Sequence, residues 1–85
     1  MAIAQTYDAT ISASTEVTFN ANTSSIKVTA VDKGIFMKWG TADVTNANFD
    51  HFIPAGETRK FRIGSNTAAN FLEEAATAKL VVVEN

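Results

Sequence analysis

Apolar and polar residues alternate over much of the chain, with the period of two that is typical of strands burying one face. Tyr7, Ala9 and Ile11, for example, are each followed by a polar residue. Strands are predicted at residues 7–14, 17–19, 26–31, 35–40, 49–53, 57–63 and 79–84. Residues 1–6 lack a strong pattern, and we expect an N-terminal arm there. Residues 7–85 are then predicted to form a single β domain.

The clearest local prediction is a hairpin over residues 26–40. Two β-rich segments are separated there by Asp32-Lys33-Gly34, and a short glycine-containing turn between such segments is typical of a hairpin. We expect the glycine of this turn to take a positive φ. The second strand places Trp39 on its inward face and Phe36 on the other, which makes both faces partly apolar.

Turn-forming residues divide the remaining strands. Pro54-Ala55-Gly56 lies between two apolar segments and predicts a tight reversal. Polar residues predict surface loops at 20–25, 41–50 and 64–70. A short strand at residues 44–45 is an alternative within the second loop.

Residues 70–78 admit two interpretations. Their apolar positions suit one face of a short helix, with Asn70 as its cap. They also suit an edge strand at 70–74 and a loop that leads into the last strand. We favour strand–loop–strand in an otherwise β chain, with the helix as the alternative. The last strand, residues 79–84, is apolar on both faces, which is typical of a central strand or of one whose outer face meets a neighbour.

These elements predict an all-β fold, a small antiparallel β-sandwich or squashed barrel of about six to eight short strands. The composition agrees, because the chain has 11 threonines but only two leucines. Threonine, valine and isoleucine favour a pleated, half-buried surface, whereas helical bundles are rich in leucine.

Composition also limits the chemistry. At 85 residues the core is small. No cysteine and a single histidine exclude the usual zinc frameworks, and a net charge of −2 makes a nucleic-acid partner unlikely. The first residues lack the pattern of a secretion signal, and no apolar run approaches the length of a membrane span. We therefore expect no catalytic residue, no metal, no cofactor and no membrane partner.

Three clusters of polar or charged residues are candidate sites. His51 follows Asp50, but adjacent residues on a strand face opposite ways, and no nucleophile or pocket is evident. The loop with Asp43, Asn46, Asn48 and Asp50 offers oxygen ligands, but it lacks the glycine and the closing glutamate of the helix–loop–helix calcium motif. We interpret this segment as a polar loop without a bound metal. We interpret His51 as a structural or loop residue.

The third cluster interleaves basic residues with an aromatic one, in the order Arg59, Lys60, Phe61, Arg62. Such a strand can bind single-stranded nucleic acid, but one aromatic residue in an acidic chain favours salt bridges to an acidic protein surface instead. Trp39 is expected to pack in the core. An exposed Trp39 or Phe36 would instead suit an interface anchor or a sugar platform.

The segment from Ile26 to Glu84 carries a resemblance. It contains Ile-Lys-Val-Thr-Ala, Gly-Ile-Phe-Met-Lys-Trp-Gly-Thr, Phe-Ile-Pro-Ala-Gly-Glu-Thr-Arg-Lys-Phe and Ala-Lys-Leu-Val-Val-Val-Glu. In these pieces the chain resembles small bacteriophage virion proteins, β-sandwiches often encoded among head genes, several of which are capsid decoration or cement proteins. The resemblance covers about two-thirds of the chain and transfers no catalytic or binding residue.

The resemblance implies a virion structural protein, most simply a capsid decoration (cement) subunit assembled in the host cytoplasm. Its partners would be the major capsid protein or other virion proteins. A thin core favours a homo-oligomer, with a trimer preferred. The expected contacts are the N-terminal arm and the loops 20–25, 41–50 and 64–70. Two alternatives stay open, a tail, fibre or adaptor component and a carbohydrate-binding β-sandwich module.

Overall fold

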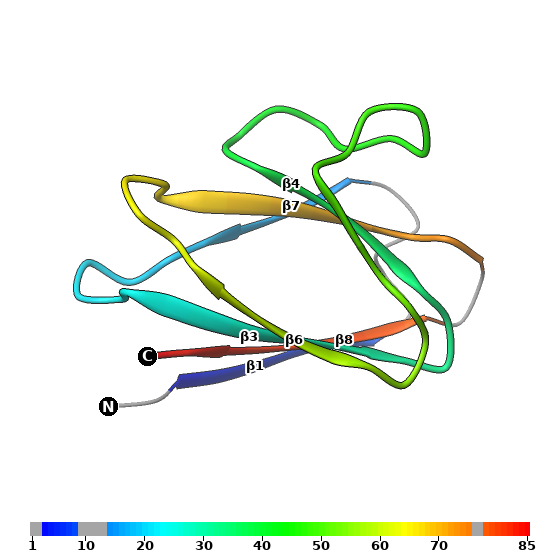
Figure 1. The fold of residues 1–85 in the computed structure, drawn as a ribbon, viewed down its shortest axis with the longest axis horizontal. Helices are drawn as coiled ribbons and strands as arrows, with labels where there is room; N and C mark the ends of the chain where they lie inside the picture. Colours follow the sequence, from blue (N-terminus) through cyan, green and yellow to red (C-terminus); the bar gives the residue numbers. More distant parts are fainter. Residues whose placement is uncertain (1–2, 9–13, 76–77) are drawn as a thin grey trace.

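The computed structural model describes the backbone of residues 3–8 and the whole of residues 14–75 and 78–85. The described chain forms two four-stranded antiparallel sheets, which lie as two layers in Figure 1. The strands are β1 Ile3–Asp8, β2 Thr15–Thr18, β3 Ser25–Val31, β4 Ile35–Trp39, β5 His51–Ile53, β6 Thr58–Arg62, β7 Ala68–Glu73 and β8 Lys79–Glu84. The predicted all-β antiparallel sandwich is confirmed.

The order of the strands follows one rule. One sheet has the order β1-β8-β3-β6 and the other β2-β7-β4-β5. Strand β1 pairs with β8, β2 with β7, β3 with β6 and β4 with β5, as if one long hairpin had been rolled up about its midpoint. This is the strand order of the eight-stranded jelly roll, in which two Greek keys form a double sheet. The midpoint of the rolled hairpin is the loop that joins β4 to β5.

The predicted hairpin over residues 26–40 is wrong. Its two strands exist, but β3 lies in one sheet and β4 in the other, so the turn between them crosses the sandwich. Asp32, with a φ of 70°, takes the left-handed conformation that was expected at Gly34. The alternation of side chains identifies a strand and its inward face, but it does not identify the strand with which it pairs.

Gly34 is needed for a different reason, which is space. A Cβ built on it would lie 2.8 Å from Cε1 of Phe52 and closer still to Cζ of the same ring. The ring of Phe52 therefore packs directly on the glycine backbone. Gly34 also donates a backbone hydrogen bond to the carboxylate of Glu74 at 3.3 Å, which fixes this turn against the end of β7.

The predicted reversal at Pro54-Ala55-Gly56 is confirmed. Glu57 N donates to Pro54 O at 3.1 Å, and Gly56 has a φ of 80°, the conformation that this turn position requires. The turn also carries the chain from one sheet to the other. Gly56 N donates to Ala30 O at 2.7 Å, so the turn is held on β3.

The helix considered for residues 70–78 is wrong, and strand–loop–strand is confirmed for the described residues. Ala69 and Phe71 on β7 are fully buried, with Asn70 between them on the opposite face, which is the period of a strand. β7 is a central strand, between β2 and β4, and not the edge strand that was predicted. The last strand, β8, is central between β1 and β3, as predicted.

The expectation of an N-terminal arm at residues 1–6 needs correction. The backbone from Ile3 to Asp8 is β1, which pairs with β8 in register along its whole length. Backbone pairing requires an available strand edge, which β8 provides, and does not require alternation in the incoming segment. Only Tyr7 and Asp8 of the strand predicted at 7–14 fall in β1, and residues 9–13 of that prediction lie outside the described residues.

The core fills the space between the two sheets. Its fully buried members come from the inward faces of both sheets and include Ile26, Val28, Ile35, Met37, Ile53, Phe71, Leu80 and Val82. Trp39 and Phe61 are partly buried and pack against this core. The described part of the chain contains no helix that could span a membrane.

Candidate interaction surfaces

The histidine considered for catalysis lies on the surface. His51 is exposed at the start of β5, and its ring packs against Phe61 at 4.7 Å between centroids. The carboxylate of the neighbouring Asp50 accepts a hydrogen bond from the backbone N–H of Trp39 at 2.9 Å. Both side chains therefore take part in packing and turn geometry at the edge of β4 and β5.

The oxygen-rich loop is organised by its own backbone. Thr45 and Asn48 exchange two backbone hydrogen bonds, at 3.1 and 3.2 Å, in an isolated bridge at the position where a short strand was an alternative. Among residues 14–75 and 78–85, no group of three or more histidine, cysteine, aspartate or glutamate side chains is placed to hold a metal ion. The four candidate ligands of this loop are all exposed.

This loop covers part of the outer face of the β2-β7-β4-β5 sheet (Figure 1). Val44 is buried, and its N–H donates to Ser14 Oγ at 3.0 Å. Ser14 in turn donates to Asn70 Oδ1 at 3.0 Å, and Asn70 Nδ2 donates to the carbonyl of Gly40 at 3.1 Å. Asn70, only 2% exposed, is thus the polar centre that attaches the loop to the sheet.

An aromatic cluster occupies the other part of this outer face. Phe36 packs against Phe49 at 4.8 Å and against Phe52 at 5.1 Å between centroids. In the sheet, Phe36 lies between Phe52 on one side and Leu72 on the other. Phe49 is 41% exposed, the most accessible large apolar side chain of the described chain. We call Phe36, Phe49 and Phe52 the outer aromatic cluster.

Trp39 belongs to a separate group of rings at the β5–β6 side of the sandwich. Its indole meets Phe19, Phe61 and His51 edge-on, at 6.3, 5.9 and 6.3 Å between centroids. It is half-buried and packs against the core, as its position on the strand predicted.

The basic cluster of β6 separates into two parts. Arg59 forms an ion pair with Glu57 at 2.8 Å, and Phe61 turns toward Trp39. Lys60 and Arg62 face outward, and Lys60 lies directly opposite Lys27 of β3. A hollow of about 410 Å³ lined by Ser24, Ser25, Lys60 and Arg62 opens there.

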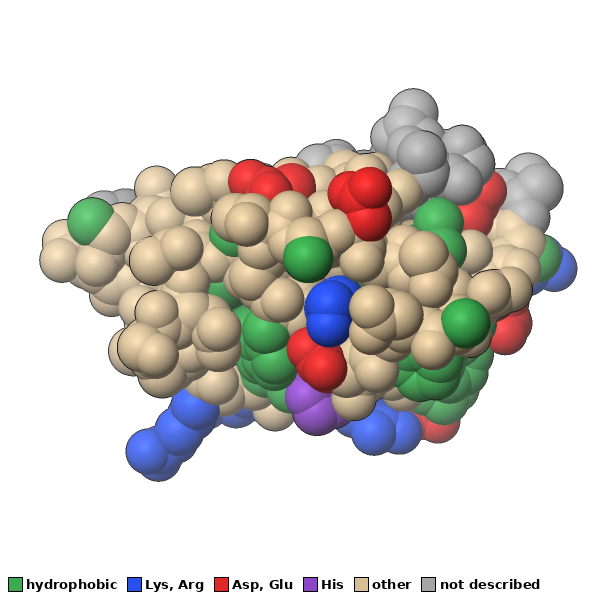
Figure 2. Space-filling model, turned by 90° about the horizontal axis from the view of Figure 1, so that it is seen from above, with side chains coloured by type: hydrophobic (Ala, Val, Ile, Leu, Met, Phe, Trp, Pro, Cys, Tyr) green, Lys and Arg blue, Asp and Glu red, His purple; other side chains and the backbone are tan. Residues whose placement is uncertain are grey.

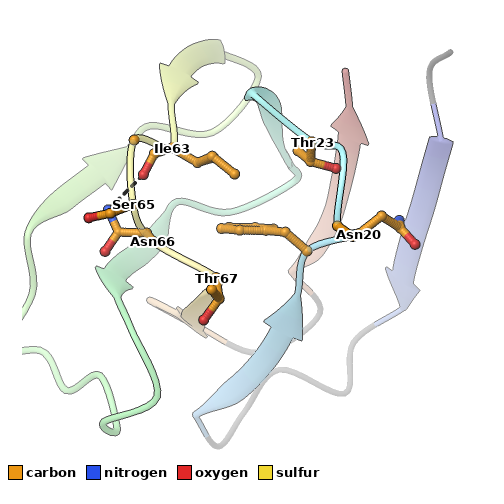
Figure 3. Close-up of a pocket in the computed structure, with 9 residues that line it drawn as sticks. Asn20, Thr23, Ile63, Ser65, Asn66 and Thr67 are labelled. Carbon is orange, nitrogen blue, oxygen red and sulfur yellow. Dashed lines mark hydrogen bonds between the residues drawn. The ribbon is translucent and has the colours of Figure 1, made fainter.

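A second hollow, of about 210 Å³, lies between two of the predicted contact loops (Figure 3). Asn20 and Thr23 come from one loop, and Ile63, Asn66 and Thr67 line the other side. The loops are joined by the hydrogen bond from Phe19 N to Thr67 O at 2.8 Å. Loops 20–25 and 64–70, which are far apart in sequence, therefore form one continuous surface.

Glu84 supports this surface and was not identified from the sequence. Its side chain is 1% exposed, and Oε1 accepts hydrogen bonds from Asn20 N at 2.8 Å, Asn20 Nδ2 at 3.1 Å and Thr23 Oγ1 at 2.7 Å. The signal was present, because Leu80, Val82 and Glu84 share the inward face of β8. A carboxylate at an inward position has to be satisfied by donors, and loop 20–25 supplies them.

No protein-family model, curated protein or solved structure matches the chain. The fold and these surfaces therefore carry the functional argument.

Proposed function

We propose that the chain is a bacteriophage virion structural protein, acting as a capsid decoration (cement) subunit. The observation that carries this proposal is the jelly-roll strand order, which viral capsid domains share. It is supported by the resemblance of residues 26–84 to small virion β-sandwich proteins. A shared fold is an argument by analogy, so the surfaces have to supply the rest.

The surfaces fit a protein that works by contact. The core is one layer of side chains between two small sheets, with no disulfide to reinforce it. Loops 20–25 and 64–70 form one continuous surface, and the outer aromatic cluster is open to solvent. Burial of these surfaces against the major capsid protein, or against other copies of the chain, stabilises both partners because binding favours the folded state. Such contacts across capsomer junctions would strengthen a shell under internal pressure.

The test uses particles of the phage whose genome encodes the chain. Mass spectrometry of purified virions is expected to detect the protein in many copies, and cryo-electron microscopy to place it on the outside of the head. Particles from a deletion strain are expected to lose DNA at lower temperature than the parent. Virions without the protein would overturn the proposal, and density confined to the tail would assign it to a tail, fibre or adaptor component.

A second candidate is a carbohydrate-binding module, because lectin domains also use the jelly roll. The outer aromatic cluster favours it, since Phe49 offers an exposed ring on which a sugar could stack. Binding to a glycan panel, measured by calorimetry, tests this candidate, and Phe49→Ala should abolish the binding. The absence of binding across the panel removes it.

A further inference from the structure

The charged side chains of the molecule are divided between its two outer faces. On the β1-β8-β3-β6 sheet, the described outward-facing charges are Lys27, Lys60, Arg62 and Lys79. Each alternates with an inward residue of its strand; Lys27, for example, lies between Ile26 and Val28, which are fully buried. Asp8 of β1 lies directly opposite Lys79 in the sheet, so this face has four cations and one acidic position. The only ion pair among the described residues is the one at Glu57 and Arg59. We call this surface the basic face.

The opposite outer face is acidic. Glu16 on β2, Asp50 before β5 and Glu74 after β7 lie on the outer side of the β2-β7-β4-β5 sheet, and Asp43 projects from the loop above it. Lys38 is the one described cation there. Figure 2, which views this side, shows several separate acidic side chains on a mostly uncharged surface, with a basic side chain among them. We call it the acidic face.

Each of the two faces also has partly exposed apolar side chains next to its charged residues. On the basic face, Val81 and Val83 of β8 are half-buried, and Val83 lies directly opposite Lys27 of β3. On the acidic face, the outer aromatic cluster lies beside Asp50 and Glu74. Each face therefore presents an apolar strip bordered mainly by charges of one sign, and the prevailing signs of the two faces are opposite.

We propose that the basic face of one copy docks on the acidic face of a second copy. A two-fold dimer would bring like faces together, and would place Lys27, Lys60 and Arg62 against the same residues of the partner. Docking of unlike faces pairs cations with carboxylates and covers the outer aromatic cluster with valines. The contact is heterologous, the type that builds rings where the rotation closes and extended stacks where it does not. This inference stands whether or not the chain belongs to a virion.

The strength of the contact should depend on salt. Exposed ion pairs contribute little individually, and the screening length falls from about 10 Å at 0.1 M salt to about 3 Å at 1 M. We expect sedimentation velocity at low salt to show mass rising with concentration, to about twofold or more above the 9.1 kDa of one chain. Transfer to about 1 M NaCl should return most of the protein to the single chain.

Charge reversal provides the decisive experiment. Lys27→Glu with Lys60→Glu makes both faces acidic, and Glu16→Lys with Asp43→Lys makes both faces basic. All four side chains are exposed, and circular dichroism checks that each variant keeps the β fold. Each double variant alone is expected to remain a single chain at concentrations where the parent associates. An equimolar mixture of the two is expected to associate again, because opposite faces are restored.

The control is Lys33→Glu, which reverses an exposed lysine in the β3–β4 turn, off both faces. It should associate like the parent. The proposal is overturned if the parent sediments as a single chain up to about 1 mM at low salt, a range that covers millimolar affinity. It is equally overturned if both double variants associate like the parent, or if their mixture stays dissociated.

Discussion

Large apolar side chains occupy two regions of the molecule, the interior between the two sheets and the outer face of the β2-β7-β4-β5 sheet. Only those in the interior are shielded completely from solvent. Between the sheets, Phe71 and its neighbours are completely buried. On the outer face, Phe36 and Phe52 are half-buried and Phe49 is 41% exposed. The interior holds the fold together, whereas the outer face has apolar surface that the described residues leave partly exposed. The two regions should therefore respond differently to the same kind of mutation.

Phe71→Ala should have the largest effect. Removal of a completely buried phenylalanine costs about 3–5 kcal/mol, because burial is lost and a cavity remains. Small domains have a total stability of only about 5–15 kcal/mol, so this one substitution should remove a large share of the free energy of unfolding. Urea denaturation followed by circular dichroism measures the change. Phe71→Leu, which retains most of the volume, is the control and should cost much less.

Glu84→Ala tests the polar end of the interior. It removes the acceptor of three hydrogen bonds from Asn20 and Thr23, and unsatisfied donors cost about 1–3 kcal/mol. We expect a loss of about 2 kcal/mol in the free energy of unfolding. Faster amide hydrogen exchange at Asn20 and Thr23 should accompany it, because the loop loses its anchor. The control Glu84→Gln keeps one acceptor oxygen and should lose less. Equal losses in the two variants would show that the charge matters more than the acceptor.

Gly34→Ala connects the two regions, because the added Cβ would overlap the ring of Phe52 in the outer aromatic cluster. We expect a cost of about 1 kcal/mol, at the low end for overpacking, because Phe52 is half-buried and can move. Gly64→Ala is the matched control, with a φ of 59° and open space around the added Cβ, so its cost is conformational only. Adding Phe52→Ala to each variant distinguishes these two costs. It should reduce the loss of stability caused by Gly34→Ala and leave the loss caused by Gly64→Ala unchanged. No relief would mean that the glycine is required for another reason.

The contrast between the two regions also shows what the sequence could predict. Alternation correctly identified β3, β4 and β6, and it placed Met37 inward and Phe36 outward. It could not show that the turn at Asp32 crosses the sandwich, because a strand has the same inward face whether its neighbour in sequence lies beside it or opposite it. The pairing depends on contacts between distant segments, such as β1 with β8.

The same limit applies to the surfaces. The cluster at Arg59, Lys60 and Arg62 was visible in the sequence, but its division was not, because it depends on which side chains of β6 lie on the inner face of the sheet and which lie on the outer face. The basic face appears only when Lys27 is brought opposite Lys60. Likewise, the net charge of −2 conceals the separation of charge between the two sides of the sandwich.

Phe49→Ala should have the smallest effect on stability and yet a clear effect on association. The ring is already 41% exposed, and surface substitutions of this kind usually change the free energy of unfolding by about 0.5 kcal/mol or less. The same substitution removes apolar area from the acidic face, so the concentration needed for self-association should rise severalfold in sedimentation velocity. Phe61→Ala is the control, because it removes a ring that packs on Trp39, away from the outer aromatic cluster. It should lower the stability of the single chain and leave the affinity of folded copies for one another almost unchanged.

If Phe49→Ala instead destabilises the single chain by more than about 1.5 kcal/mol, the outer aromatic cluster contributes to folding like the interior, since losses of that size come from buried contacts. The cluster would then need no partner to explain it.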